Sequence, residues 1–140
     1  KLNARSHGNK VTNLAIEFLT NPQLPRTSGP YSYGTKYGNL ILTSGQIALD
    51  PNTNEIVTDI RKATRMVLDC LLLVVEAGGG TKETIAKVDV YLKDLNDFEA
   101  FNEVYSEFFG THKPARVTVQ AGDLAEGATI EAAVTAFTAE

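Results

Sequence analysis

The fold of this chain is decided by one stretch near its end, Pro114-Ala115-Arg116-Val117-Thr118-Val119-Gln120-Ala121-Gly122. Its side chains alternate in character, as they do along a β-strand with two different faces. One face carries Arg116, Thr118 and Gln120, and the other carries two valines. The stretch therefore predicts a strand with an arginine at its start.

A second strand, predicted over residues 130–137, alternates in the same way. One row is apolar and begins with Ile130, whereas the other row begins with Glu131 and continues with small side chains. If Val117 and Val119 cover the same core as the Ile130 row, Arg116 and Glu131 lie together on the opposite face of the sheet. We therefore expect one guanidinium and one carboxylate side by side on a second packed surface.

Length and composition limit the class of protein. The 140 residues form one domain, and no apolar run reaches the ~18 residues that a membrane span needs. The formal net charge of −4 argues against a general nucleic-acid binder, which would need a basic face. With a single cysteine, Cys70, no internal disulfide can form; we expect this thiol to be a buried small hydrophobe and the compartment to be reducing.

The first twelve residues contain basic side chains and no acid. We expect residues 1–12 to be a flexible extension and 13–140 to be the domain. The alternative for this segment is the tail of an organelle transit peptide, which is basic and poor in acids. The expected location is therefore the cytoplasm, or a mitochondrion or plastid if a transit peptide was present.

Periodicity predicts the order strand–strand–helix–strand–helix–strand–strand, over residues 14–19, 40–44, 58–77, 85–92, 96–110, 114–122 and 130–137. Thr58 or Asp59 can cap the first helix, and Asn96 with Glu99 matches a capping box for the second. A hairpin turn is expected at 37–39. This order predicts an α+β domain, a mixed sheet with both helices on one face. Nothing in the chain is left to cover the other face, so we expect another subunit there.

Arg116 and Glu131 are the candidate catalytic residues. In the simplest interpretation they form only a salt bridge, because an ionised acid among apolar neighbours needs a partner. In the functional interpretation Arg116 binds the acid group of a substrate, and Glu131 positions and deprotonates a water. The two histidines, His7 and His112, have no metal-ligand spacing, and no nucleotide-binding motif is present, so we expect neither metal nor cofactor.

Several ordered motifs give the chain a family resemblance. Pro114-Ala115-Arg116, then Gly122-x-Leu124, then Ile130-Glu131 resemble the signature of the RidA/YjgF (UK114-like) family of reactive intermediate deaminases. The segments 28–32, 43–47, 90–95 and 101–105 resemble family segments in the same order. The resemblance implies a chorismate-mutase-like fold, a homotrimer with sites between subunits, and hydrolysis of 2-aminoacrylate and other 2-imino acids to 2-keto acids and ammonia without a cofactor.

By this resemblance Arg116 binds the substrate carboxylate and Glu131 the attacking water, while Tyr31, Ser44 and Asn102 line the cleft. Thr118 is part of the same site, at a position where many members have cysteine. Two other functions stay open: a non-catalytic regulatory trimer that binds a small acid, and an RNA-cleaving translation inhibitor. The presence of both Arg116 and Glu131 favours the enzyme, because a sensor needs only the arginine.

Overall fold

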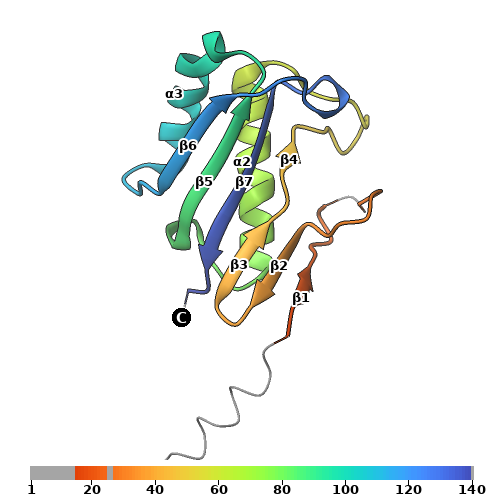
Figure 1. Cartoon of the computed structure of the whole chain (residues 1–140), viewed down its shortest axis with the longest axis vertical. Helices are drawn as coiled ribbons and strands as arrows, with labels where there is room; N and C mark the ends of the chain where they lie inside the picture. Colours follow the sequence, from red (N-terminus) through yellow and green to blue (C-terminus); the bar gives the residue numbers. More distant parts are fainter. Residues whose placement is uncertain (1–14, 25–26, 140) are drawn as a thin grey trace, which may run out of the picture.

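The computed structural model describes residues 15–24 and 27–139 as a single sheet with helices on one side (Figure 1). The strands are β1 (Glu17–Leu19), β2 (Gly34–Tyr37), β3 (Leu40–Thr43), β4 (Gln46–Ile47), β5 (Ile85–Leu92), β6 (Ala115–Gln120) and β7 (Ile130–Phe137). The helices are α2 (Ile60–Ala77) and α3 (Phe98–Phe109), with short 3₁₀ turns η1 (Lys82–Thr84), η2 (Leu95–Asp97) and η3 (Ala125–Gly127). The expected extension over residues 1–12 lies outside the described residues.

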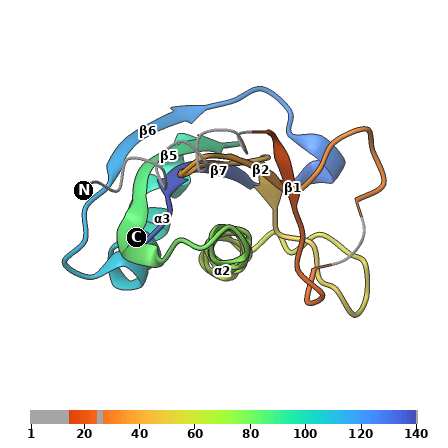
Figure 2. The same ribbon diagram turned by 90° about the horizontal axis from the view of Figure 1, so that it is seen from below.

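The strand order is β1-β2-β3-β7-β5-β6, and β4 pairs with β7 beyond the end of β3. The sheet is mixed, because β5 runs parallel to β6 and antiparallel to β7. Both helices lie on the same side of it (Figure 2), which confirms the predicted α+β architecture. The opposite side, here called the outer face, is covered by no helix in the described part of the chain.

Two strands were not predicted. The sequence Gly-Thr-Lys-Tyr of β2 has no apolar alternation, and β4 has only two residues, too few to show a period. The hairpin between β2 and β3 was predicted correctly, since Tyr37 pairs with Leu40 across a two-residue loop. Gly38 has φ 62 at the first loop position, as in a type II′ turn, which only glycine adopts easily.

The helix α2 supplies most of the core on its side of the sheet. It begins one residue after Asp59, whose Oδ2 accepts a hydrogen bond from the Lys62 backbone N–H at 3.0 Å. Two adjacent rows of its side chains are buried, which explains the broad apolar stripe seen in the sequence: Ala63, Thr64, Val67, Leu68, Leu71, Val74 and Val75. The width of the stripe thus reflects deep burial within the protomer.

The predicted cap of the second helix was wrong. Asn96 lies inside the 3₁₀ turn η2, and its backbone N–H donates to Asp94 Oδ1 at 2.9 Å. The helix α3 follows without a break from Phe98, so the capping carboxylate, Asp94, lies two residues before the predicted cap and caps η2 instead. The aromatic stripe of α3 is largely core, as expected, with Phe101, Tyr105 and Phe108 buried.

The face assignment of β6 was also wrong. Val88 of β5 is fully buried and pairs with Arg116 on one side and Val134 on the other, so Arg116 lies on the helix side of the sheet. Val117 and Val119 lie on the outer face and are 46% and 41% exposed. The strand β6 lies at the edge of the sheet, and on its helix side it meets α3. The polar row of β6 faces this helix, and the apolar row faces outward.

The outer face is more apolar than the small and polar surface expected. Register places on it exposed large side chains from six strands: Phe18, Tyr37, Leu42, Tyr91, Val117, Val119 and Phe137. Lys87 and Asp89 form an ion pair among them, with Nζ and Oδ1 3.4 Å apart. An irregularity in β5 leaves Ala86 exposed, although strict alternation with the buried Val88 and Val90 would place it inside.

Candidate active site

The predicted site residues fall into two groups in one protomer. Arg116, Asn102 and Thr118 lie between β6 and α3 and form, with the rings of Phe98, Phe101 and Tyr105, what we call the arginine cluster. Tyr31, Ser44 and Glu131 line a pocket beside β4, which we call the glutamate pocket. The sequence had suggested one site, whereas the structure separates these residues into two groups.

In the arginine cluster, the guanidinium of Arg116 is held by an amide and by aromatic rings. Its Nη1 donates to Asn102 Oδ1 at 2.8 Å. Its Cζ lies 4.6 Å from the ring centroid of Tyr105, and 5.4 and 5.6 Å from those of Phe101 and Phe98. Among the described residues no carboxylate forms an ion pair with it. Most donors of the guanidinium fork are therefore left for another partner.

Two hydroxyls beside this arginine are buried without a hydrogen-bond partner, Thr118 Oγ1 and Tyr105 Oη. Burial raises the pKa of the Tyr105 phenol, and the positive charge of Arg116 lowers it in part. The Thr118 side chain points to the helix side but exposes no hydroxyl surface, so in this protomer it cannot reach a ligand through its oxygen.

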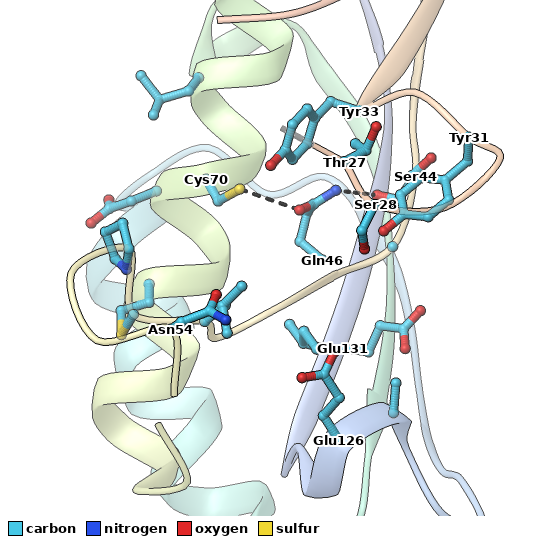
Figure 3. Close-up of a pocket in the computed structure, with 18 of the residues that line it drawn as sticks. Thr27, Ser28, Tyr31, Tyr33, Ser44, Gln46, Asn54, Cys70, Glu126 and Glu131 are labelled. Carbon is cyan, nitrogen blue, oxygen red and sulfur yellow. Dashed lines mark hydrogen bonds between the residues drawn. The ribbon is translucent and has the colours of Figure 1, made fainter. Parts of the chain in front are cut away.

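The glutamate pocket has a volume of about 800 Å³ and opens between the 27–33 loop, β4 and the middle of α2 (Figure 3). Ser44 follows the end of β3, and its Oγ donates to the Ser32 backbone carbonyl at 2.6 Å. This bond fixes the loop that carries Tyr31, whose ring lies exposed over the backbone of Gly29. Ser44 and Tyr31 are thereby held at one side of the pocket.

Gly45 sets the position of the Glu131 side chain. A Cβ at Gly45 would overlap Oε2 of Glu131, so the carboxylate lies directly against the Gly45 backbone and would have to move if residue 45 had a side chain. Glu131 itself is half-buried, pairs with Ile47 across the β4–β7 ladder, and has no ion pair within the described parts of the chain. Its carboxylate therefore borders the pocket with no cation of the described residues paired to it.

The inner side of the pocket is formed by Cys70, Gln46 and Tyr33. The thiol of Cys70 donates to Gln46 Oε1 at 3.4 Å, and Gln46 Nε2 donates weakly to the Ser44 carbonyl, also at 3.4 Å. Burial raises the pKa of Cys70 to about 11. The thiol is less enclosed than expected, since it borders the pocket, but it stays protonated at neutral pH, in keeping with the non-catalytic role predicted for it.

The arginine cluster and the Glu131 carboxylate do not meet within one protomer. Arg116 lies on β6 and Glu131 on β7, with β5 between them, and they pair with β5 residues three positions apart. Strand spacing and rise together place their Cα atoms about 14 Å apart, with side chains on opposite faces. The simple Arg116–Glu131 salt bridge is therefore absent from the fold of a single chain.

Other candidate chemistry is limited in the described residues. His112 uses Nε2 to contact the Ile85 carbonyl at 2.8 Å, a structural bond between α3 and β5. No group of three or more acidic, histidine or cysteine side chains there could hold a metal ion. No helix in residues 15–24 and 27–139 is long and apolar enough to cross a membrane.

Comparison with known proteins identifies the family. The family described as Endoribonuclease L-PSP matches residues 22–138. A RutC family protein of Pyrococcus abyssi is 44% identical over 125 residues, which is 89% of this chain and 98% of the relative. The chain belongs to the RidA/YjgF family. A 2-iminobutanoate/2-iminopropanoate deaminase of Escherichia coli is 41% identical over 76% of this chain and 86% of its own.

Solved structures agree with the RidA/YjgF assignment. The crystal structure of Escherichia coli TdcF with bound serine superposes with a TM-score of 0.83 at 34% identity, over 88% of this chain and 99% of that one. The sheet and helices described above are therefore the fold of the family. The names of these relatives describe a deaminase and a serine-binding protein, and the family description names an endoribonuclease.

Sequence reasoning on this RidA/YjgF chain missed two contacts. Gly45 lies against Glu131, and Tyr105 lies against Arg116. The only signal for the second was the polar Asn102, which interrupts the aromatic stripe one residue after Phe101. The contact of Gly45 left no signal, because a glycine after a strand is equally typical of an ordinary turn.

Proposed function

We propose that the protein hydrolyses 2-imino acids, including the imine of 2-aminoacrylate, to 2-keto acids and ammonia. The observation that carries the proposal is the state of Arg116: a fixed guanidinium that no carboxylate of the described chain neutralises. Such a fork matches a substrate carboxylate with two parallel hydrogen bonds. Glu131 is the complementary group, a carboxylate in a pocket whose described lining contains no cationic side chain.

The reaction needs only a positioned water and a base. The water oxygen attacks the iminium carbon, the C=N electron pair moves to nitrogen, and Glu131 accepts a proton from the water. That proton then passes to the amino nitrogen of the tetrahedral adduct. The C–N bond breaks, ammonia leaves, and the hydroxyl loses its proton as the C=O bond forms. Because the iminium carbon is already electrophilic, orientation of substrate and water can supply much of the acceleration.

A complete site in this proposal needs a second copy of the chain. A three- or four-carbon imino acid cannot span the separation between Arg116 and Glu131 in one protomer. The apolar outer face supports association of copies, since contiguous exposed apolar surface of this kind usually marks an interface. In the proposed homotrimer, the arginine cluster of one copy and the Glu131 carboxylate of the next complete each site.

The relatives support the same substrate class. One is named for deamination of 2-iminobutanoate and 2-iminopropanoate, and another is described with bound serine, a small amino acid whose carboxylate resembles that of an imino acid. The replacement of the common cysteine by Thr118 is compatible with the proposal, because its hydroxyl is buried and the position can contribute only its backbone to the cleft.

RNA cleavage is the second candidate, favoured by the description of the family. The pocket counts against it. Its described lining includes three carboxylates, from Asp69, Glu126 and Glu131, and no lysine, arginine or histidine. Such a lining repels a phosphate backbone, which is bound by basic side chains. The overall charge of −4 has the same effect.

The test is ammonia release from imines generated in place by an amino-acid oxidase, measured above the uncatalysed rate. Wild type is compared with Arg116→Ala and with Arg61→Ala, a surface arginine paired with Glu103, as the matched control. We expect acceleration by wild type and by the control, and its loss in Arg116→Ala. Equal rates with and without wild-type protein would rule out the proposed activity.

A further inference from the structure

We infer that Tyr105 is a positioning residue for the carboxylate anchor: its ring holds the Arg116 guanidinium in the orientation that binds substrate. The inference rests on the proposed function, in which Arg116 receives the substrate carboxylate. Tyr105 belongs to the aromatic stripe of α3, and the inference gives it a role in substrate binding in addition to its place in the core. Of the three rings beside Arg116, that of Tyr105 is nearest, at 4.6 Å from Cζ.

The ring of Tyr105 is itself immobilised. The residue is only 8% exposed, and its ring packs between those of Phe101, at 5.4 Å, and Phe109, at 4.8 Å. All three belong to the helix α3, whose side chains face the sheet. The guanidinium therefore rests on a rigid surface, and its side chain loses little further freedom when a ligand binds.

An aromatic ring is suited to this task because it orients an arginine without using its donors. A cation–π contact draws on the positive charge of the guanidinium over the ring face, and it pairs none of the N–H groups with an oxygen acceptor. A carboxylate neighbour would have occupied the same N–H pair that a substrate needs. Here Asn102 Oδ1 accepts one N–H bond, and the remaining donors stay available in the plane.

The contribution comes from the ring and not from the hydroxyl. Tyr105 Oη is buried and has no hydrogen-bond partner. An unsatisfied buried hydroxyl is unfavourable, so its removal should not weaken the protein. Tyr105→Phe should therefore keep the Arg116 contact and the activity, whereas Tyr105→Leu should lose both.

The experiment compares Tyr105→Leu with Phe109→Leu. Phe109 is on the same helix, is buried to a similar degree and touches the Tyr105 ring, but it makes no contact with Arg116. In hydrolysis of oxidase-generated imines we expect Tyr105→Leu to raise KM about tenfold with kcat changed less than about threefold. Phe109→Leu should leave KM within about twofold of wild type, and so should Tyr105→Phe.

A double-mutant cycle and a direct readout separate this inference from the proposed function. In the Arg116→Ala background, Tyr105→Leu should have no further effect on KM, because the residue acts only through the arginine. The ¹⁵N relaxation of Arg116 Nε should show greater mobility in Tyr105→Leu than in Phe109→Leu. This second measurement requires no activity, so it tests the positioning even if the protein hydrolyses no imine.

The outcomes are distinct. If Tyr105→Leu and Phe109→Leu have equal KM values and equal Arg116 mobility, the positioning role is wrong, whatever the activity of wild type. If Arg116→Ala hydrolyses imines normally, the proposed function is wrong, and the relaxation data alone decide the positioning. Should Tyr105→Leu not fold, Tyr105→Met is measured in its place, because an unbranched side chain fills an irregular gap better.

Discussion

The arginine cluster and the glutamate pocket hold their charged groups in different ways. Arg116 is fixed by side chains, three aromatic rings and one amide, all from the single helix α3. Glu131 is fixed by backbone, against Gly45 and in the ladder with β4. Two of the rings that contact Arg116, Phe101 and Tyr105, belong to the core, whereas Glu131 borders a pocket formed by loops, β4 and α2.

This difference has consequences for substitution. In the arginine cluster, rings can be exchanged for rings of similar size while the guanidinium keeps its support. In the glutamate pocket the support is the absence of a side chain, and even one methyl group at Gly45 must move the carboxylate. We therefore expect the base side of the reaction to be more sensitive to small changes than the anchor side.

The largest effect is expected for Glu131→Gln. An amide cannot accept the proton of the attacking water, and general-base contributions are about 10²- to 10⁴-fold. We expect kcat to fall in this range while the variant stays folded and still binds a 2-keto acid, as measured by calorimetry. Glu83→Gln, an exposed glutamate in η1, is the control. Loss of the fold in Glu131→Gln would instead indicate a structural role for this carboxylate.

Arg116→Ala should lower kcat/KM by about a hundredfold, because a bidentate charge-assisted contact is lost. Arg116→Lys should recover only part of it, since an ammonium has no planar fork. The melting temperature should change little, because Arg116 lies at the sheet edge and has no ion pair to lose. Full activity of the lysine variant would contradict the bidentate binding.

Mixed assemblies test whether the two halves combine between copies. In a cyclic trimer formed at random from equal amounts of Arg116→Ala and Glu131→Gln chains, about one quarter of interfaces join two intact halves. Co-expressed chains should therefore recover about a quarter of wild-type activity, while each variant alone remains inactive. Native mass spectrometry verifies mixing. If mixed trimers form without recovered activity, the proposed intersubunit site is wrong. Either Arg116 and Glu131 then act within the same protomer, or only one of the two residues belongs to an active site.

Gly45→Ala should reduce kcat by about tenfold or more, because small displacements of a catalytic group are costly. The matched control is Gly122→Ala, where an added Cβ meets nothing within 4 Å. Both variants are compared in the imine assay and in thermal unfolding. If Gly45→Ala and Gly122→Ala have the same kcat, the contact between Gly45 and Glu131 has no part in positioning the base.

The smallest effect concerns the inner side of the pocket. With its pKa raised to about 11, the Cys70 thiol should react slowly with iodoacetamide at pH 7.5 and faster as pH rises toward 11, since the thiolate is the nucleophile. Cys70→Ser should leave kcat/KM within about twofold. Rapid alkylation at neutral pH, blocked by a 2-keto acid, would show that the thiol belongs to the reacting part of the pocket.

The secondary structure could be predicted largely from the order of residues. The alternation of 130–137 and the helical period of 60–77 are local patterns, and the strand ending at Leu92 and the helix ending before Gly110 were located correctly. The family followed from several short motifs in a fixed order. The two missed strands are short or polar, so they exist only because neighbouring strands pair with them.

Only the tertiary structure decided which face each row occupies. Alternation divides the strand 115–120 into an apolar and a polar row, but it does not state which row faces the helices. Pairing of Arg116 with the buried Val88 turns the polar row inward, beneath α3, and turns Val117 outward. In the same way Glu131 meets Gly45 only through the β4–β7 ladder. Such contacts join residues far apart in the chain, and no local pattern contains them.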